Sequence, residues 1–197
     1  MLLQRERLSE SDQRELTSDL VEQLDELTLL VEDVVELARN GEQVTRLQSV
    51  RLDEVVSEAV WRTSRHATKV RFELATNGPS VVRGEPERLR RAVRNLLENA
   101  AKWSPPHGIV HVSVRGGTLV VQDEGPGIEE ADLPHVFERF YRAPAVRSTP
   151  GSGLGLAIVK QVADAHGASV SAANVPGGGA VLSLSLPLAV DAGESPG

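Results

Sequence analysis

The stretch NLLENAAKWS, from Asn95 to Ser104, decides the fold. It closes a run of helix-forming residues that starts at Glu87 and ends before two consecutive prolines, which cannot continue a helix. At helical spacing the two asparagines share one face with the lysine and the tryptophan, while the leucines and alanines lie toward a side that a sheet can cover. Asparagine is a poor residue inside a helix, so two on one face indicate compensation from outside the helix.

Three further blocks follow in a fixed order: DEGPGI (123–128), FERFYR (137–142) and GSGLGLAIV (151–159). Asp123 ends an apolar strand, where its carboxylate can accept a hydrogen bond from the amino group of adenine. Guanine presents a carbonyl at that position, so two acceptors would face each other and a buried polar group would stay unpaired. Gly125 and Gly127 leave the backbone free to approach a ligand.

The last block opens a helix, and backbone N–H groups at a helix N-terminus form an anion site. The chain contains no P-loop, and its glycines run G-x-G-x-G without a strand immediately before them, unlike the dinucleotide fingerprint. The FERFYR block holds three of the six aromatic residues of the chain, which can anchor a loop onto the core. We expect residues 129–150 to form a lid that closes on a nucleotide.

The net charge of -7 is unevenly distributed. Residues 9–39 carry ten acidic and two basic side chains, so the rest of the chain is nearly neutral. Such a body lacks the basic footprint of nucleic-acid binding, and we expect no nucleic-acid partner. The chain has no cysteine, which excludes disulfides and thiolate metal sites, and it has no apolar run of ~18 residues. These features favour a cytoplasmic protein.

A heptad pattern precedes the four blocks and predicts a long helix over residues 9–40. Its apolar positions are spaced 4, 3, 4, 3, 4: Leu20, Leu24, Leu27, Val31, Val34 and Ala38. The helix either bundles with other helices or packs on its own domain, and the absence of an obvious local partner favours bundling. The remaining boundaries are a residual hairpin turn at 1–8, a linker at 41–48, a catalytic domain at 49–188 and a flexible tail at 189–197.

Hydrophobic periodicity within residues 49–188 predicts an α+β two-layer sandwich. Strands are expected at residues 49–52, 70–74, 80–82, 109–114, 118–122, 169–173 and 180–186. Helices are expected at residues 53–66, 87–103 and 153–166. Asp53 is the expected cap of the first helix. His166 lies at the end of the last helix, where a cation is mildly favoured, and each of the five histidines is expected to have a structural role.

In their order the four blocks resemble the N box, first glycine box, F box and second glycine box of bacterial two-component sensor histidine kinases. The resemblance covers about residues 49–188 and implies a Bergerat-type ATP-binding fold, shared with gyrase and the heat-shock chaperone ATPase. It also implies ATP and Mg²⁺ as cofactors and a homodimeric parent kinase anchored in the cell membrane. The heptad helix resembles the second helix of the dimerisation and phosphotransfer hairpin.

The resemblance assigns roles residue by residue. Asn99 resembles the Mg²⁺ ligand with Asn95 in support, and Lys102 completes the catalytic group as a phosphate contact. Arg142 resembles another phosphate contact, and Asp123 resembles the adenine reader. The full ATP-binding set that it implies is Asn95, Asn99, Lys102, Trp103, Asp123, Gly125, Gly127, Ile128, Arg139, Phe140, Arg142, Gly151, Ser152, Gly153, Leu154, Gly155 and Leu156. Within it, Trp103 replaces the usual Tyr or His, and the first glycine box resembles a lid hinge.

The chain departs from the family pattern at the phosphoacceptor. None of its five histidines stands in an H-E-x-[RK]-like motif, so we expect the chain to begin just after the helix that bears that histidine. It should bind Mg-ATP without phosphorylating itself, use a histidine-bearing helix of the parent kinase, and serve a response regulator receiver domain. Asn95 stands where hydrolytic relatives place a Glu, and an amide cannot act as a general base. The alternatives are an ATPase or serine kinase of the same superfamily and a non-enzymatic partner of a kinase bundle.

Overall fold

The computed structural model describes residues 16–17, 47–144 and 152–189. The chain divides into two compact units, Met1–Ala38 and Arg39–Gly197. Leu16 and Thr17 are helical, and the rest of the heptad helix lies outside the described residues, as do the linker up to residue 46, residues 145–151 of the expected lid and the tail from residue 190. No helix in the described ranges is long and apolar enough to cross a membrane.

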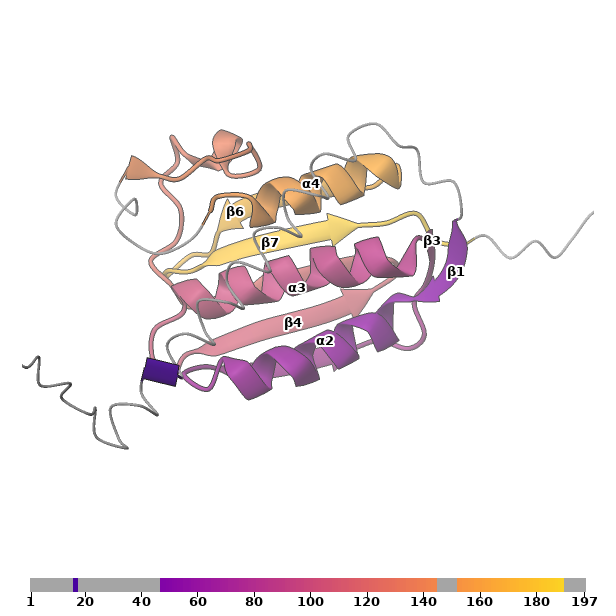
Figure 1. The fold of residues 1–197 in the computed structure, drawn as a ribbon, viewed down its shortest axis with the longest axis horizontal. Helices are drawn as coiled ribbons and strands as arrows, with labels where there is room; N and C mark the ends of the chain where they lie inside the picture. The colour runs from indigo at the N-terminus through magenta and orange to yellow at the C-terminus, as the bar shows by residue number, and fades with distance from the viewer. Residues whose placement is uncertain (1–15, 18–46, 145–151, 190–197) are drawn as a thin grey trace, which may run out of the picture. The chain divides into compact units, whose positions relative to one another are not determined.

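A five-stranded sheet forms one layer of the second unit (Figure 1). Its strands, in spatial order, are β2 (Arg71–Thr76), β4 (Ile109–Arg115), β5 (Thr118–Gln122), β7 (Ala180–Ser185) and β6 (Ser169–Asn174). The β2–β4 pair is parallel and the other three pairs are antiparallel. A separate antiparallel pair, β1 (Gln48–Arg51) with β3 (Val81–Gly84), lies beside the ends of this sheet.

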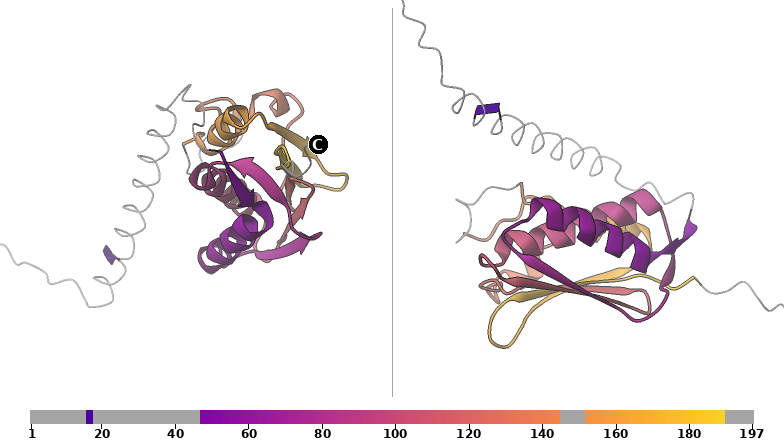
Figure 2. Two further views of the ribbon diagram at one scale, coloured as in Figure 1. Left: turned by 90° about the vertical axis from the view of Figure 1, so that its right-hand side faces the viewer. Right: turned by 90° about the horizontal axis from the view of Figure 1, so that it is seen from below.

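Three helices cover one face of the sheet, and no described helix covers the other face (Figure 2). They are α2 (Leu52–His66), α3 (Pro86–Trp103) and α4 (Gly155–Ala165), with α3 in the middle. β4 shows the two faces most clearly, because Val110, Val112 and Val114 are buried while His111 and Ser113 are exposed. This alternation is typical of a sheet with one solvated face. The α+β two-layer fold predicted from the sequence is confirmed.

The elements expected within residues 49–188 are all present, with boundaries that differ by at most two residues. One such difference is at α4, which begins at Gly155 and not at Gly153. Gly153 has a φ of +71°, outside the right-handed helical region, so it ends the loop before the helix. A short 3-10 turn, η1 (Leu133–His135), lies in the segment expected to be a lid and had no counterpart in the sequence prediction.

The expected role of Asp53 as a helix cap is wrong. The capping position of α2 is Arg51, which makes no side-chain capping bond, and Asp53 lies inside the first turn. Its Oδ1 accepts a hydrogen bond from the backbone N–H of Ser80, 2.9 Å away, and its carboxylate pairs with Arg51. The Arg51 guanidinium, together with the Ser80 N–H, lowers the pKa of Asp53 to about 2. Asp53 therefore joins α2 to the residue before β3.

The expected structural role of His166 is confirmed, although the imidazole is neutral and not a cation. The imidazole is only 6% exposed, and Nε2 accepts a hydrogen bond from the backbone N–H of Glu85 at 2.9 Å. Nδ1 therefore carries the proton and donates it to the carbonyl of Val162 at 2.7 Å. Burial lowers the pKa of His166, and nearby Arg88 lowers it further. A neutral histidine thus ties the end of α4 to Glu85, the capping residue of α3.

Candidate nucleotide-binding site

The second half of α3 meets the start of α4 at Asn95. Asn95 is 7% exposed, and its Nδ2 is buried without a hydrogen-bond partner among the described residues. Gly155, the first residue of α4, lies directly beside it, since a Cβ built on that glycine would be 3.7 Å from Asn95 Cγ. Among the described residues, no side chain caps α4. An unpaired buried amide next to an uncapped helix N-terminus forms a place where an anion can satisfy both.

One helical turn later, α3 brings Asn99, Lys102 and Trp103 together. The indole Nε1 of Trp103 donates a hydrogen bond to Asn99 Oδ1 at 3.2 Å. Lys102 is exposed, and its Nζ lies 4.9 Å from the centroid of the Trp103 ring. The amide oxygen of Asn99 keeps a second lone pair, which can ligate a hard cation. Part of the face predicted from the sequence is therefore assembled by direct contacts.

Asp123 follows β5 and is 3% exposed. Its Oδ1 accepts hydrogen bonds from the backbone N–H groups of Gly125, at 2.8 Å, and Ala180, at 3.1 Å. Its own N–H donates to the Ala180 carbonyl at 2.9 Å. No described residue donates a hydrogen bond to Oδ2. One carboxylate oxygen is thus fixed by the protein, and the other remains available as an acceptor for an amino group.

The first glycine box is held in place by its neighbours. A Cβ on Gly125 would lie 2.6 Å from the carbonyl oxygen of Trp103, so glycine is required there by the close approach of the end of α3. The structure gives a packing reason for this glycine, where the sequence suggested access for a ligand.

Ile128, which ends the box, is bound on both backbone groups by the side chain of Asn174: Oδ1 accepts its N–H at 2.7 Å, and Nδ2 donates to its carbonyl at 2.6 Å. Asn174 was missed from the sequence, because one polar residue at a strand end carries no signal.

The second glycine box packs against the end of the FERFYR block. The N–H of Phe140 donates to the carbonyl of Gly153 at 3.1 Å. A Cβ on Gly153 would lie 2.8 Å from the Tyr141 carbonyl oxygen and 3.1 Å from Cγ of Arg142, so Arg142 is beside the loop. Ser152 Oγ accepts the N–H of Leu154 at 3.2 Å.

Side chains of the second glycine box contribute unequally. Leu154 is buried at 2% exposure, so only its backbone can face a ligand, and Leu156 is half-buried. Gly151 lies outside the described residues.

Within FERFYR, the predicted anchoring onto the core is wrong for Phe140, and the contacts of Tyr141 are with residues of the same segment, 129–150. Phe140 is 68% exposed and has a φ of +60°, which is rare for a residue with a side chain. The hydroxyl of Tyr141 donates to Asp132 Oδ1 at 2.6 Å, and its ring centroid lies 5.5 Å from that of His135. Arg139 is exposed. The block is therefore tied by Tyr141 to residues that precede it.

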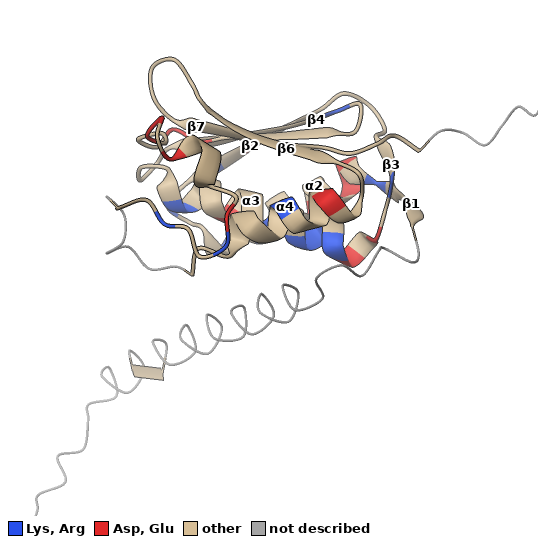
Figure 3. Ribbon diagram, turned by 90° about the horizontal axis from the view of Figure 1, so that it is seen from above, with Lys and Arg blue, Asp and Glu red and all other residues tan. Residues whose placement is uncertain are grey.

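Charged side chains of both signs are interspersed over the helices, and the strands carry few of them (Figure 3). The pairs along α2 and α3 are local ones, such as Arg62 with Glu58 at 2.6 Å and Arg94 with Glu98 at 3.9 Å. Exposed pairs of this kind contribute little to stability. Within the described ranges, no three His, Cys, Asp or Glu side chains gather as a metal-binding group. A Mg²⁺ ion would therefore rely on the Asn99 oxygen, nucleotide phosphates and water, which suits its preference for oxygen ligands.

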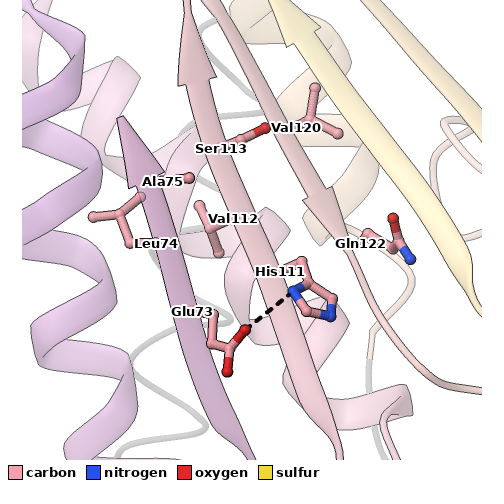
Figure 4. A pocket seen from close by; sticks show the side chains of 8 residues that line it. All are labelled: Glu73, Leu74, Ala75, His111, Val112, Ser113, Val120 and Gln122. Atoms are coloured by element: carbon pink, nitrogen blue, oxygen red, sulfur yellow. Dashed lines mark ion pairs between the residues drawn. The ribbon is translucent and has the colours of Figure 1, made fainter. Parts of the chain in front are cut away.

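A hollow of about 320 Å³ lies elsewhere, on the open face of the sheet (Figure 4). It is lined by Glu73, Leu74, Ala75, His111, Val112, Ser113, Val120 and Gln122. Glu73 points toward His111, with Oε2 3.5 Å from Nδ1. The sheet separates this hollow from the helices that carry Asn95 and Asn99, so it is not part of the nucleotide site.

Residues 84–190 match the model of a family described as histidine kinase-, DNA gyrase B-, and HSP90-like ATPase. The signal transduction histidine-protein kinase/phosphatase MprB of Mycobacterium sp. (strain KMS) is 45% identical over 178 residues, which cover 87% of this chain and 34% of that protein. The chain thus spans about a third of the length of the curated relatives it matches.

Two solved structures are similar. One is a mycobacterial sensor histidine kinase MprB, with a TM-score of 0.65 and 39% identity, covering 73% of this chain and 98% of that one. The other is full-length ShkA in complex with AMPPNP, with a TM-score of 0.72 and 29% identity, covering 91% of this chain and 39% of that one.

Proposed function

The chain belongs to the histidine kinase-, DNA gyrase B- and HSP90-like ATPase family and is the catalytic ATP-binding domain of a sensor histidine kinase; from this premise we propose how its residues divide the work. Adenine is read by Asp123, the phosphates bind at the start of α4 beside Asn95, and Asn99 holds Mg²⁺. The observation that carries the proposal is the buried, unpaired amide of Asn95 next to the uncapped N-terminus of α4.

Each end of the nucleotide meets a group suited to it. Oδ1 of Asp123 is occupied by two backbone N–H groups, which leaves Oδ2 to accept the amino group of adenine. Lys102 follows Asn99 on α3, Arg142 lies beside Gly153 in the loop before α4, and both would supply positive charge for phosphate oxygens. Mg²⁺, when bound, neutralises charge on the transferring phosphoryl group. Trp103, Arg139 and Phe140 complete the proposed set as contacts at its rim.

The site is suited to phosphoryl transfer more than to hydrolysis. An amide at position 95 cannot take a proton from water. Glu98 is next to Asn99 in sequence, but it is exposed and 3.9 Å from Arg94, on a different side of α3. We therefore propose that an imidazole nitrogen attacks the γ-phosphorus, the bond from phosphorus to the β–γ bridging oxygen breaks, and ADP leaves. The chain supplies positioning and charge for this step.

The partners proposed for the reaction come from the parent kinase and its pathway. A histidine-bearing helix of that kinase would present the acceptor, and a response regulator receiver domain would take the phosphoryl group from it. The parent is proposed to be a homodimer in the cell membrane with this domain on the cytoplasmic side. Steady-state ATP hydrolysis or phosphorylation of serine would instead favour the superfamily's ATPases or serine kinases.

Calorimetric titration with Mg-ATP and Mg-GTP tests the proposal. The wild-type chain should bind ATP saturably and GTP weakly. Asn99→Ala should weaken ATP binding about tenfold in the presence of Mg²⁺, and much less in its absence. Ser113→Ala, on the open face of the sheet, is the matched control and should bind like wild type. Equal affinity for ATP and GTP, or no binding by the wild-type chain, would contradict the proposal.

A further inference from the structure

Asn174 makes two hydrogen bonds that join distant parts of the chain. It is the last residue of β6, and its side-chain amide pairs with both backbone groups of Ile128, at 2.7 Å and 2.6 Å. The two residues are 46 positions apart. Oδ1 accepts and Nδ2 donates, so the amide makes the same pair of bonds as a neighbouring strand would. No other natural side chain of this length offers both a donor and an acceptor in this arrangement.

The residue before Ile128 is shaped to allow this pairing. Gly127 has a φ of +79°, and a Cβ there would lie 2.9 Å from Asn174 Oδ1. A side chain at position 127 would therefore be strained and would also push the amide away. The first glycine box and the end of β6 fit each other at this point.

The same hairpin that carries Asn174 also holds the adenine-reading carboxylate. After β6 the chain turns through residues 175–179 into β7, whose first residue, Ala180, donates to Asp123 Oδ1. A side chain at Gly179 would collide with the carbonyl of Asp123. The β6–β7 hairpin thus contacts the DEGPGI block at both ends, at Asp123 through Ala180 and at Ile128 through Asn174.

We propose that Asn174 is a positioning residue for the adenine end of the nucleotide site: it fixes Gly127 and Ile128 against β6 and so sets the position of the block that carries Asp123. This inference rests on the proposed function of the site.

Two variants separate the two bonds. Asn174→Ala removes both, and Asn174→Asp has the same size but loses the donor to the Ile128 carbonyl and places a carboxylate oxygen against it. Ser171→Ala is the matched control on the same strand, because it removes one exposed hydrogen bond, to Ser183 Oγ, that lies away from the glycine box. Calorimetry gives dissociation constants for Mg-ATP, Mg-ADP and Mg-GTP, and amide exchange reports on Ile128.

Loss of the Asn174 hydrogen bonds should weaken binding at the adenine end of the nucleotide. Asn174→Ala and Asn174→Asp should each raise the dissociation constants for ATP and ADP by the same factor, about fivefold to tenfold, and raise that for GTP less. Exchange of the Ile128 N–H should speed up while β4 stays protected, and the unfolding midpoint without nucleotide should match that of Ser171→Ala.

The opposite results have distinct meanings. Unchanged ATP affinity in both variants, with normal wild-type binding, would overturn the positioning role of Asn174. An equal loss for all three nucleotides, accompanied by a lower unfolding midpoint, would also overturn it by indicating a general structural role. If Asn174→Ala fails to fold, Asn174→Asp decides. Absence of ATP binding by the wild-type chain would refute the proposed function itself.

Discussion

The two ends of the α3–α4 pair are built in opposite ways. At one end, His166 satisfies the N–H of Glu85 and the carbonyl of Val162, and Arg88 lies 3.1 Å from the Glu85 carboxylate. At the other end, Asn95 has a buried amide nitrogen without a partner among the described residues, and α4 begins without a side-chain cap. The polar groups are therefore hydrogen-bonded at the end that only holds the two helices together. They lack partners among the described residues at the end where a ligand is expected. Stability and function can be separated by substitutions at the two ends.

The largest effect is expected from Asp123→Asn. The new amide can keep its oxygen on the N–H groups of Gly125 and Ala180 and turn its NH₂ toward the ligand, which converts an acceptor into a donor. ATP affinity should fall about a hundredfold while GTP affinity rises relative to it. The free energy of unfolding should change by less than about 1 kcal/mol, because both internal bonds survive. Calorimetry and urea unfolding measure the two quantities, and a variant that still prefers ATP would contradict the assigned role.

His166→Ala should destabilise the contact between α3 and α4 at the end where His166 binds Glu85. It removes the acceptor of the Glu85 N–H and leaves a cavity between α3 and α4, so the free energy of unfolding should fall by about 2 kcal/mol. ATP affinity of the folded fraction should stay within about twofold, because the substitution is at the far end of α4. Urea unfolding and calorimetry at low temperature test this, and Lys160→Ala on the exposed side of α4 is the control. A large loss of ATP affinity without a loss of stability would mean that the His166 end serves binding and not stability.

Asn95→Leu should raise the stability of the protein and lower its affinity for the nucleotide. It replaces an unpaired buried amide with an apolar side chain of similar size, so the nucleotide-free protein should gain about 1 kcal/mol of unfolding free energy. Mg-ATP affinity should fall about tenfold in the same protein. A variant that loses both stability and affinity would mean that Asn95 is structural.

A smaller effect on the free energy of unfolding is expected from a change of pH. Because burial lowers the pKa of His166 below its ordinary value of 6.5, the unfolded chain takes up a proton first as the pH falls. Stability should therefore decline as the pH falls below about 6.5, and His166→Ala should remove that slope.

Asp53 titrates in a separate window. Its pKa of about 2 lies below its ordinary value of 3.8, so its contribution is lost as the pH falls from about 4 toward 2. Asp53→Asn should remove that second slope and leave the first. Unfolding free energies measured between pH 7 and pH 3 distinguish the two, and a single slope that neither variant alters would contradict both assignments.

The sequence predicted what depends on local periodicity and on motif order. The valine alternation of β4 and the apolar face of α3 placed both layers, and the four blocks predicted a nucleotide site, which we propose lies between α3, α4 and the end of β5. Contacts between segments far apart in sequence were beyond it. Asn174 binds a backbone 46 residues away, and His166 accepts the backbone N–H of Glu85, 81 residues away.

The exposed position of Phe140 was also beyond the sequence. An aromatic cluster predicts burial, but a φ of +60° turns Phe140 outward while Tyr141 bonds to Asp132. That backbone conformation is set by the contact with Gly153, which belongs to another block. Local composition therefore identified the aromatic cluster of FERFYR, but it did not identify which of its rings is buried or hydrogen-bonded.

Fluorescence of Trp103 tests the central claim most directly. The chain has two tryptophans, and Trp61 is exposed on α2, so Trp61→Phe leaves Trp103 as the sole reporter beside Asn99. Titration of this variant with Mg-ATP should give a saturable change in Trp103 emission and a much weaker response to Mg-GTP, and adding Asp123→Asn should shift the ATP response to about hundredfold higher concentrations. An identical response to ATP and GTP, or no response to either, would contradict an ATP site between α3 and α4.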